Sequence, residues 1–203
     1  AELIDSGIDA GSMPEIIRYG LIILLAAIAS LAFGVGAGKT SAVAAAGFAI
    51  PWAFSGLYGL RMLEGGYLLV LTPLVAAFCS DALALFTGMA LGRHKLAPLV
   101  SPHKTVEGAA GGLVGGMAGM AIFCLVYRAI TGVNLGLPLC VALGLLGALL
   151  GELGDLSFSA VKRQYGIKDY GRLLPGHGGV LDRFDSVLFA APVLCALLRA
   201  LAA

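Results

Sequence analysis

Residues 108–130 read GAAGGLVGGMAGMAIFCLVYRAI, and Arg128 is the only charged side chain in this stretch. About 20 mostly apolar residues in a helix are enough to cross the hydrocarbon core of a bilayer. Glycine recurs at every fourth position in two registers, 108/112/116 and 111/115/119. Small residues at this interval let two helix backbones approach closely in lipid. The stretch therefore predicts a membrane-spanning helix that packs closely on another helix, in the same chain or in a second copy.

The composition of the whole chain agrees with this interpretation. Hydrophobic residues make up 59% of the 203 residues and charged residues only 12%, with a mean hydropathy of +0.96. A typical globular chain has about 25% charged residues, so this chain cannot cover a water-soluble surface. The same composition excludes a nucleic-acid binder with a broad basic face, and the net charge of +1 implies no bulk electrostatic partner, so we expect no nucleic-acid partner. The composition indicates an integral membrane protein.

The same criterion of length and hydropathy predicts an all-α, polytopic membrane protein with about six glycine-packed helices. We expect the fifth to be short within the membrane and to continue as a helix beyond its surface. The six expected spans are Ile16–Gly38, Ser41–Leu60, Tyr67–Thr87, Gly108–Ile130, Leu137–Leu153 and Phe184–Leu201.

The distribution of Lys and Arg predicts the orientation in the membrane. Nine of the 13 positive charges fall in three loops on one side of the expected spans: Lys39, Arg93, Lys95, Lys104, Lys162, Arg163, Lys168, Arg172 and Arg183. Cytoplasmic loops carry an excess of Lys and Arg. We therefore expect a multi-pass protein of the cell (inner) membrane, with these loops and the active site facing the cytoplasm.

Carboxylates gather at the same face as the basic loops. One lies inside the third span and the others lie at the ends of the fourth, fifth and sixth: Asp81, Glu107, Glu152, Asp155, Asp182 and Asp185. Ionisable residues at membrane depth are costly, and each is a candidate for function. Carboxylates beside lysines and arginines suit a divalent metal that holds a polyphosphate. A small membrane transporter would also use such charges, although the chain has no internal repeat.

The end of the fifth span places polar residues on one helix face. Glu152, Asp155, Ser159, Lys162 and Arg163 are spaced i, i+3, i+7, i+10 and i+11. This spacing is compatible with a phosphate and metal site, and equally with an ordinary amphipathic helix end that carries ion pairs.

The following segment favours the site. Residues 174–185 read LPGHGGVLDRFD, and the glycines around His177 allow the backbone to approach a phosphate closely. Residues 159–185, which combine Ser159, Lys162-Arg163, Lys168-Asp169 and this segment, resemble the C-terminal pattern of the phosphatidate cytidylyltransferases (CDP-diacylglycerol synthases). Residues 101–108, SPHKTVEG, resemble a second motif of that family, and residues 81–93, from Asp81 to Arg93, resemble a third.

The resemblance covers residues 41–203 and implies a cytidylyltransferase membrane domain there. Residues 1–40, an acidic segment and the first helix, match no motif, so the resemblance implies an N-terminally short member. CTP-dependent polyprenol or dolichol kinases have a similar Lys-Arg…His-Gly-Gly pattern and are the alternative; the SPHKT block and the DRFD ending favour the cytidylyltransferases.

The resemblance also implies a reaction, a metal and a set of site residues. CTP and phosphatidic acid would give CDP-diacylglycerol and pyrophosphate at a membrane surface, with Mg²⁺ and a second cation as cofactors. A homodimer is expected from the glycine spacing described above, and not from the resemblance. The metal ligands would be Asp155, Asp182 and Asp185, with Ser159 as a secondary candidate. Lys162, Arg163, Lys168 and Arg183 would bind the triphosphate, with His177, Gly178 and Gly179 beside it. Lys104 and Arg93 would meet the lipid phosphate or the other end of CTP. Asp81 and Glu107 would belong to the metal site or to a buried network.

Overall fold

The computed structural model describes residues 51, 53–63, 65–164, 166–170 and 181–202. The expected span Ile16–Gly38 lies outside these residues, and only the end of Ser41–Leu60 lies within them, where residues 53–61 are helical. The labelled elements are α4 (Gly66–Leu69), α5 (Thr72–Leu91), β1 (Lys95–Ala97), β2 (Ser101–Thr105), α6 (Val106–Thr131), α7 (Leu137–Gln164) and α8 (Leu181–Ala202).

Four segments of the described residues are long and apolar enough to cross a membrane: Gly66–Leu91, Val106–Thr131, Leu137–Gln164 and Phe184–Leu201. They confirm the expected third to sixth spans in place and order. Large apolar side chains such as Phe86, Met89 and Ile122 are more than half exposed on the outside of the bundle. A polar solvent would make such a surface costly, whereas lipid chains cover it.

The helix boundaries follow from local sequence. Pro73 lies in the first turn of α5, where its missing N–H costs nothing. The Thr105 hydroxyl accepts a hydrogen bond from the Gly108 N–H and caps α6. At the other end of α6, Gly132 adopts φ 75°, a left-handed conformation that favours glycine and terminates the helix.

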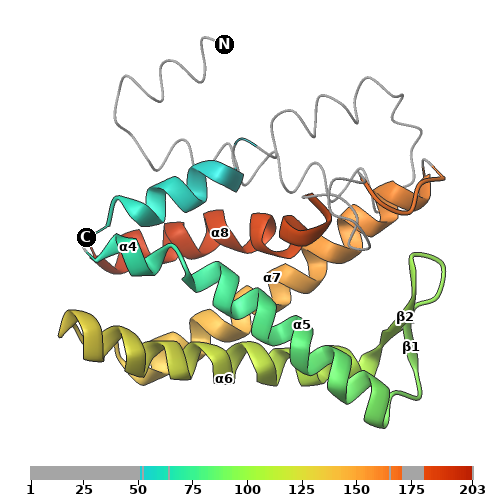
Figure 1. The fold of residues 1–203 in the computed structure, drawn as a ribbon, viewed down its shortest axis with the longest axis horizontal. Helices are drawn as coiled ribbons and strands as arrows, with labels where there is room; N and C mark the ends of the chain where they lie inside the picture. Colours follow the sequence, from blue (N-terminus) through green and yellow to red (C-terminus); the bar gives the residue numbers. More distant parts are fainter. Residues whose placement is uncertain (1–50, 52, 64, 165, 171–180, 203) are drawn as a thin grey trace.

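Figure 1 shows that α5 and α6 meet near the hairpin and that α7 crosses them. In chain order, each of the helices α5 to α8 packs against the next. Where α6 meets α7 the backbones touch, because a Cβ built on Gly144 would lie 2.4 Å from the Gly116 carbonyl oxygen. Gly115 and Gly119 face Cys79 of α5 in the same close way. Both glycine registers of α6 therefore contact helices of the same chain.

The hydrophobic core occupies one end of this bundle. Its buried side chains include Leu69 at the end of α4, Tyr127 near the end of α6, Leu143 near the start of α7 and Leu198 near the end of α8. The chain directions place the opposite ends of these helices together at the other end of the bundle. The polar residues expected to form the site lie on those opposite ends.

A two-stranded antiparallel hairpin, β1–β2, joins α5 to α6 at the polar end (Figure 1). It pairs Lys95 with Thr105 and Ala97 with Ser101, with an irregularity between Lys95 and Ala97. The mostly helical architecture agrees with the expected all-α fold. The hairpin is an exception, because the prediction had no strands at residues 95–105. At its base, the residues leading into the hairpin bond to Glu107 and to the start of α6.

Candidate active site

Two lysine–carboxylate pairs lie at the polar end of the bundle. Lys104 of β2 places its Nζ 2.6 Å from Oδ2 of Asp155 on α7. Lys162 of α7 places its Nζ 2.9 Å from Oδ1 of Asp182 in the first turn of α8. Segments that are far apart in sequence thus meet at one place, because the hairpin, the end of α7 and the start of α8 share this end.

The two pairs differ in their exposure to solvent. The side chains of Lys162 and Asp182 are 10% and 7% exposed, whereas those of Lys104 and Asp155 are 25% and 28% exposed. A buried ion pair depends strongly on both partners, since either charge alone is poorly solvated. The Lys162–Asp182 pair therefore holds α7 and α8 together, and the Lys104–Asp155 pair lies at the more open part of the site.

More carboxylates than lysines surround these pairs. Asp81 of α5 interacts electrostatically with Lys104, Asp155 and Glu152. Asp185 of α8, which is buried, interacts with Asp155 and Lys162, and its Oδ1 accepts the Ser186 N–H at 2.8 Å. The site is therefore rich in negative charge, which a bound cation would balance.

The helix face expected at the end of the fifth span is present. The Ser159 hydroxyl donates a hydrogen bond to Oδ1 of Asp155 at 3.2 Å, one turn apart on α7. Lys162 lies on the same helix and reaches α8. Ser159 and Asp155 thus interact as an ordinary i,i+4 pair, while Asp155 also bonds to Lys104 of the hairpin.

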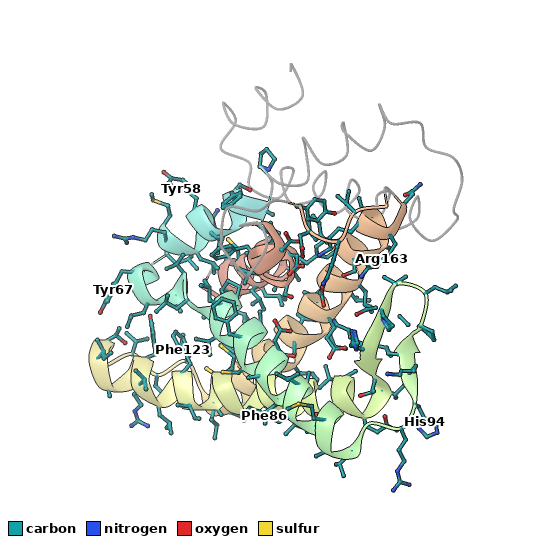
Figure 2. All side chains as sticks on the ribbon, turned by 45° about the vertical axis from the view of Figure 1, so that its right-hand side comes forward. Tyr58, Tyr67, Phe86, His94, Phe123 and Arg163 are labelled. Atoms are coloured by element: carbon teal, nitrogen blue, oxygen red, sulfur yellow. The ribbon has the colours of Figure 1, made fainter. Side chains whose placement is uncertain are left out.

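Arg163 and Arg93 both lie close to the hairpin. The Arg163 Nε donates to the Val100 carbonyl at the hairpin tip, 3.1 Å away, and the side chain is exposed. Figure 2 shows Arg163 and His94 at the same end of the bundle, away from Tyr58 and Tyr67. Arg93 is exposed just after α5, and its backbone N–H donates to Oε2 of Glu107. Neither arginine is paired with Asp155 or Asp182 in the part of the chain that the structure describes.

The remaining expected site residues lie between the end of α7 and the first turn of α8 in the sequence. Lys168 is exposed in the turn after α7. His177, Gly178 and Gly179 lie outside the described residues, and for Arg183 only the backbone, in the first turn of α8, is described.

Tyr170 belongs to the site although the sequence analysis did not select it. Its backbone N–H donates to Oδ2 of Asp182 at 2.8 Å, its hydroxyl donates to the Phe158 carbonyl at 3.0 Å, and its ring centroid lies 5.4 Å from the Lys162 Nζ. Burial, with the negative charges of Asp182 and Asp185, raises the pKa of Tyr170 to about 12. The phenol therefore stays protonated at neutral pH. Its position directly after Lys168-Asp169 was the available signal.

The donor set suits Mg²⁺ by its chemistry. Carboxylate oxygens are the ligands this ion prefers, and it is usually held by one or two carboxylates together with substrate phosphates rather than by a complete protein cage. Among the residues described here, no three His, Cys, Asp or Glu side chains form a metal-binding group by themselves. A metal at this place would need further ligands from outside these residues, such as substrate phosphates.

Comparison with known proteins identifies the family of the chain. A model of the cytidylyltransferase family matches residues 13–201, so the match begins within the segment for which no motif was apparent. Relatives named phosphatidate cytidylyltransferase include that of Staphylococcus saprophyticus, 43% identical over 129 residues, and that of Bacillus subtilis, 48% identical over 126 residues. These alignments cover 64% and 61% of this chain and 48% and 45% of the relatives. The chain thus spans about half the length of the curated relatives it matches. On the family match, which covers most of its length, the chain belongs to the cytidylyltransferase family.

Proposed function

We propose that the chain transfers the cytidylyl group of CTP to phosphatidic acid, giving CDP-diacylglycerol and pyrophosphate. The observation that carries the proposal is the convergence of the Lys104–Asp155 and Lys162–Asp182 pairs at one end of a bundle of membrane-spanning helices. The names of the relatives give the reaction, and the site offers the cations and carboxylates that two phosphate substrates require.

The reaction is an in-line displacement at phosphorus. A phosphate oxygen of the lipid forms a bond to the α-phosphorus of CTP, and the bond from that phosphorus to the bridging oxygen breaks. Pyrophosphate leaves with the bonding electron pair. The attacking phosphate is already an anion, so the protein needs to position and neutralise the reactants rather than remove a proton.

We assign the charged residues by their places in the site. Lys162, Arg163, Lys168 and Arg183 lie on or near the ends of α7 and α8 and would bind the triphosphate and the departing pyrophosphate. Lys104 and Arg93 lie on and beside the hairpin and would bind the lipid phosphate. His177, Gly178 and Gly179, which lie between α7 and α8 in the sequence, would also contact the phosphates.

Asp155, Asp182 and Asp185 would hold Mg²⁺, and a second cation would be held by the surrounding carboxylates. The metal would supply charge stabilisation for the phosphates during displacement. Lys104 and Lys162 each form an ion pair with one of these carboxylates, Asp155 and Asp182 respectively. When phosphates bind, the lysines can bond to them instead.

We also propose that the polar end faces the cytoplasm in a cell membrane of six spans. Six of the described cationic side chains lie at this end: Arg93, Lys95, Lys104, Lys162, Arg163 and Lys168. The other three are Arg61, just before α4, and Arg128 and Arg199, in the last turns of α6 and α8. The excess on one side follows the rule for cytoplasmic loops. Close glycine packing of the helices and a homodimer remain part of this proposal.

The experiment that tests the function compares two labels in CTP. The purified chain in detergent is incubated with phosphatidic acid, Mg²⁺ and CTP labelled at the α- or the γ-phosphorus. We expect the α-label in the lipid phase and the γ-label in pyrophosphate. Transfer of γ-label to a polyprenol would identify a lipid kinase instead, and a folded chain that transfers neither label would contradict the proposal.

A further inference from the structure

Glu107 holds the base of the hairpin to the start of α6. Its Oε2 accepts the backbone N–H groups of Arg93, at 3.0 Å, and His94, at 3.2 Å. Its Oε1 lies 2.6 Å from Nδ1 of His94. The backbone of His94 is bonded to α6 as well, because its carbonyl accepts the Val106 N–H at 2.9 Å. One carboxylate therefore bonds to Arg93 and His94, two of the three residues that lead from α5 into β1.

Thr105 fixes the other strand of the hairpin at the same place. Its hydroxyl caps α6, and its side chain packs against three glycines, Gly88, Gly92 and Gly108. A Cβ on Gly92 would lie 2.8 Å from the Thr105 methyl group, and a Cβ on Gly108 would lie 2.9 Å from its hydroxyl oxygen. The glycines thus make room for Thr105 between α5 and α6.

The neighbour of Thr105 is Lys104, the hairpin residue that reaches the site. Successive residues of a strand point to opposite faces, so Thr105 enters the contact between α5 and α6 while Lys104 points away from it. Lys104 is then carried to Asp155 of α7. The place of the Lys104 ammonium group therefore depends on how the base of the hairpin is held.

From these contacts we propose that Glu107 is a positioning residue, which fixes the hairpin so that Lys104 meets Asp155 and the substrate phosphate. The activity part of this proposal rests on the proposed function. Two of these three contacts of Glu107 are with neutral backbone N–H groups. Its role is therefore to place acceptor oxygens within hydrogen-bond distance of the hairpin backbone, which depends on the length of the side chain. A metal ligand in this position would need its negative charge.

Three substitutions separate reach from charge. Glu107→Gln keeps a carbonyl oxygen at the same reach and removes the charge. Glu107→Asp keeps the charge and shortens the side chain by one methylene group, and Glu107→Ala removes both. The proposal predicts that Gln preserves the hairpin, that Asp does so incompletely, and that Ala releases it.

Amide hydrogen exchange of the full chain in detergent measures the release without any substrate. We expect Glu107→Ala to accelerate exchange in residues 92–105, while exchange in the α5 and α6 interiors stays as in the wild type. Glu107→Gln should exchange like the wild type throughout. Unchanged exchange of residues 92–105 in Glu107→Ala overturns the proposal, as does acceleration over the whole chain, which would indicate a general loss of folding.

Cytidylyl transfer gives the second readout. We expect Glu107→Ala to lower kcat/KM about 100-fold, the effect of a misplaced catalytic group, and Glu107→Gln to stay close to the wild type. In a Lys104→Ala background, Glu107→Ala should add little further loss, because it acts through Lys104. If Glu107→Gln is as inactive as Glu107→Ala while its exchange is normal, Glu107 acts chemically and the proposal is wrong. If the wild-type chain shows no transfer, the proposed function fails, and the exchange measurement still decides the role of Glu107.

Discussion

The buried pair between Lys162 and Asp182 gives a prediction that does not depend on the reaction. Lys162→Met replaces the lysine with a neutral side chain of similar length. The Asp182 carboxylate, whose side chain is 7% exposed, then loses an ammonium group 2.9 Å away while the Tyr170 N–H bond remains. Removing one partner of a buried ion pair costs about 3–5 kcal/mol. We take about 3 kcal/mol here, because the pair lies at the end of the bundle.

Thermal unfolding measures this loss. For a chain of this size, about 3 kcal/mol lowers the Tm by roughly 6–12 °C. A thiol-reactive dye in detergent is a suitable probe, because Cys124, Cys140 and Cys195 are buried and become reactive on unfolding. Lys168→Met is the matched control; this lysine is exposed, and its removal should hardly change the Tm.

The double variant Lys162→Met with Asp182→Asn tests the reasoning itself. Replacing both members of a buried ion pair by neutral groups is often close to neutral for stability. We therefore expect the double variant to be more stable than Lys162→Met alone. A Tm of Lys162→Met equal to that of the wild type, or a double variant whose loss is the sum of both single losses, would refute the idea that this pair joins α7 to α8.

Three further predictions concern packing, pH and metal. Gly144→Ala should lower the Tm clearly, because its Cβ would lie 2.4 Å from the Gly116 carbonyl oxygen, whereas Gly151→Ala on the same helix, with its nearest contact at 3.4 Å, should be tolerated; equal effects would contradict close contact of α6 and α7. The pKa of Tyr170 is raised from 10 to about 12 in the folded protein, so the wild type should lose stability as the pH rises from 10 to 12. Tyr170→Phe should lose less stability over that range, as followed by the Tm at each pH. Identical pH profiles would contradict the raised pKa. Chelation of divalent cations should abolish cytidylyl transfer and Mg²⁺ should restore it, with full activity in the chelator contradicting the metal assignment.

The positions of the spans could be predicted because they depend only on local composition. A run of apolar residues long enough for the bilayer forms a helix wherever it occurs, and the fold confirms the expected third to sixth spans. The continuation of α7 beyond the fifth expected span followed from the i, i+3, i+7 spacing of Glu152, Asp155 and Ser159. The start of α8 next to Asp182 followed from the apolar run after Asp185.

The hairpin could not be predicted in the same way. Residues 95–105 contain Pro98 and Pro102 and show no regular alternation of apolar residues, which is the usual signal of a strand. The hairpin is held by contacts with residues outside it, mainly Glu107 and the glycines around Thr105. Contacts of this kind depend on how α5 and α6 pack, and the sequence alone does not give that packing.

The pairing of charges in the site was also beyond the sequence. The motifs identified Lys104, Lys162 and Asp182, and the carboxylates at the membrane face added Asp155. Nothing in their spacing says which lysine meets which carboxylate across the bundle. Arg163 illustrates the difficulty, because its place beside Lys162 gives no sign that its Nε bonds to the Val100 carbonyl of the hairpin. Its phosphate contact stays a prediction. The direction of a side chain at a helix end depends on the neighbouring segments, and only the three-dimensional fold provides them.

The central claim is that cytidylyl transfer takes place at the end of the bundle where Asp155 bonds to Lys104 and Ser159. The most direct measurement is the rate of α-label transfer from CTP to phosphatidic acid by Asp155→Asn, compared with Arg128→Gln at the opposite end of α6. The account predicts that Asp155→Asn loses about 100-fold or more of the transfer rate and that Arg128→Gln keeps a normal rate. The loss of rate should not follow the differences in Tm among the wild type and the two variants. A wild-type rate for Asp155→Asn, or an equal loss for Arg128→Gln, would contradict it.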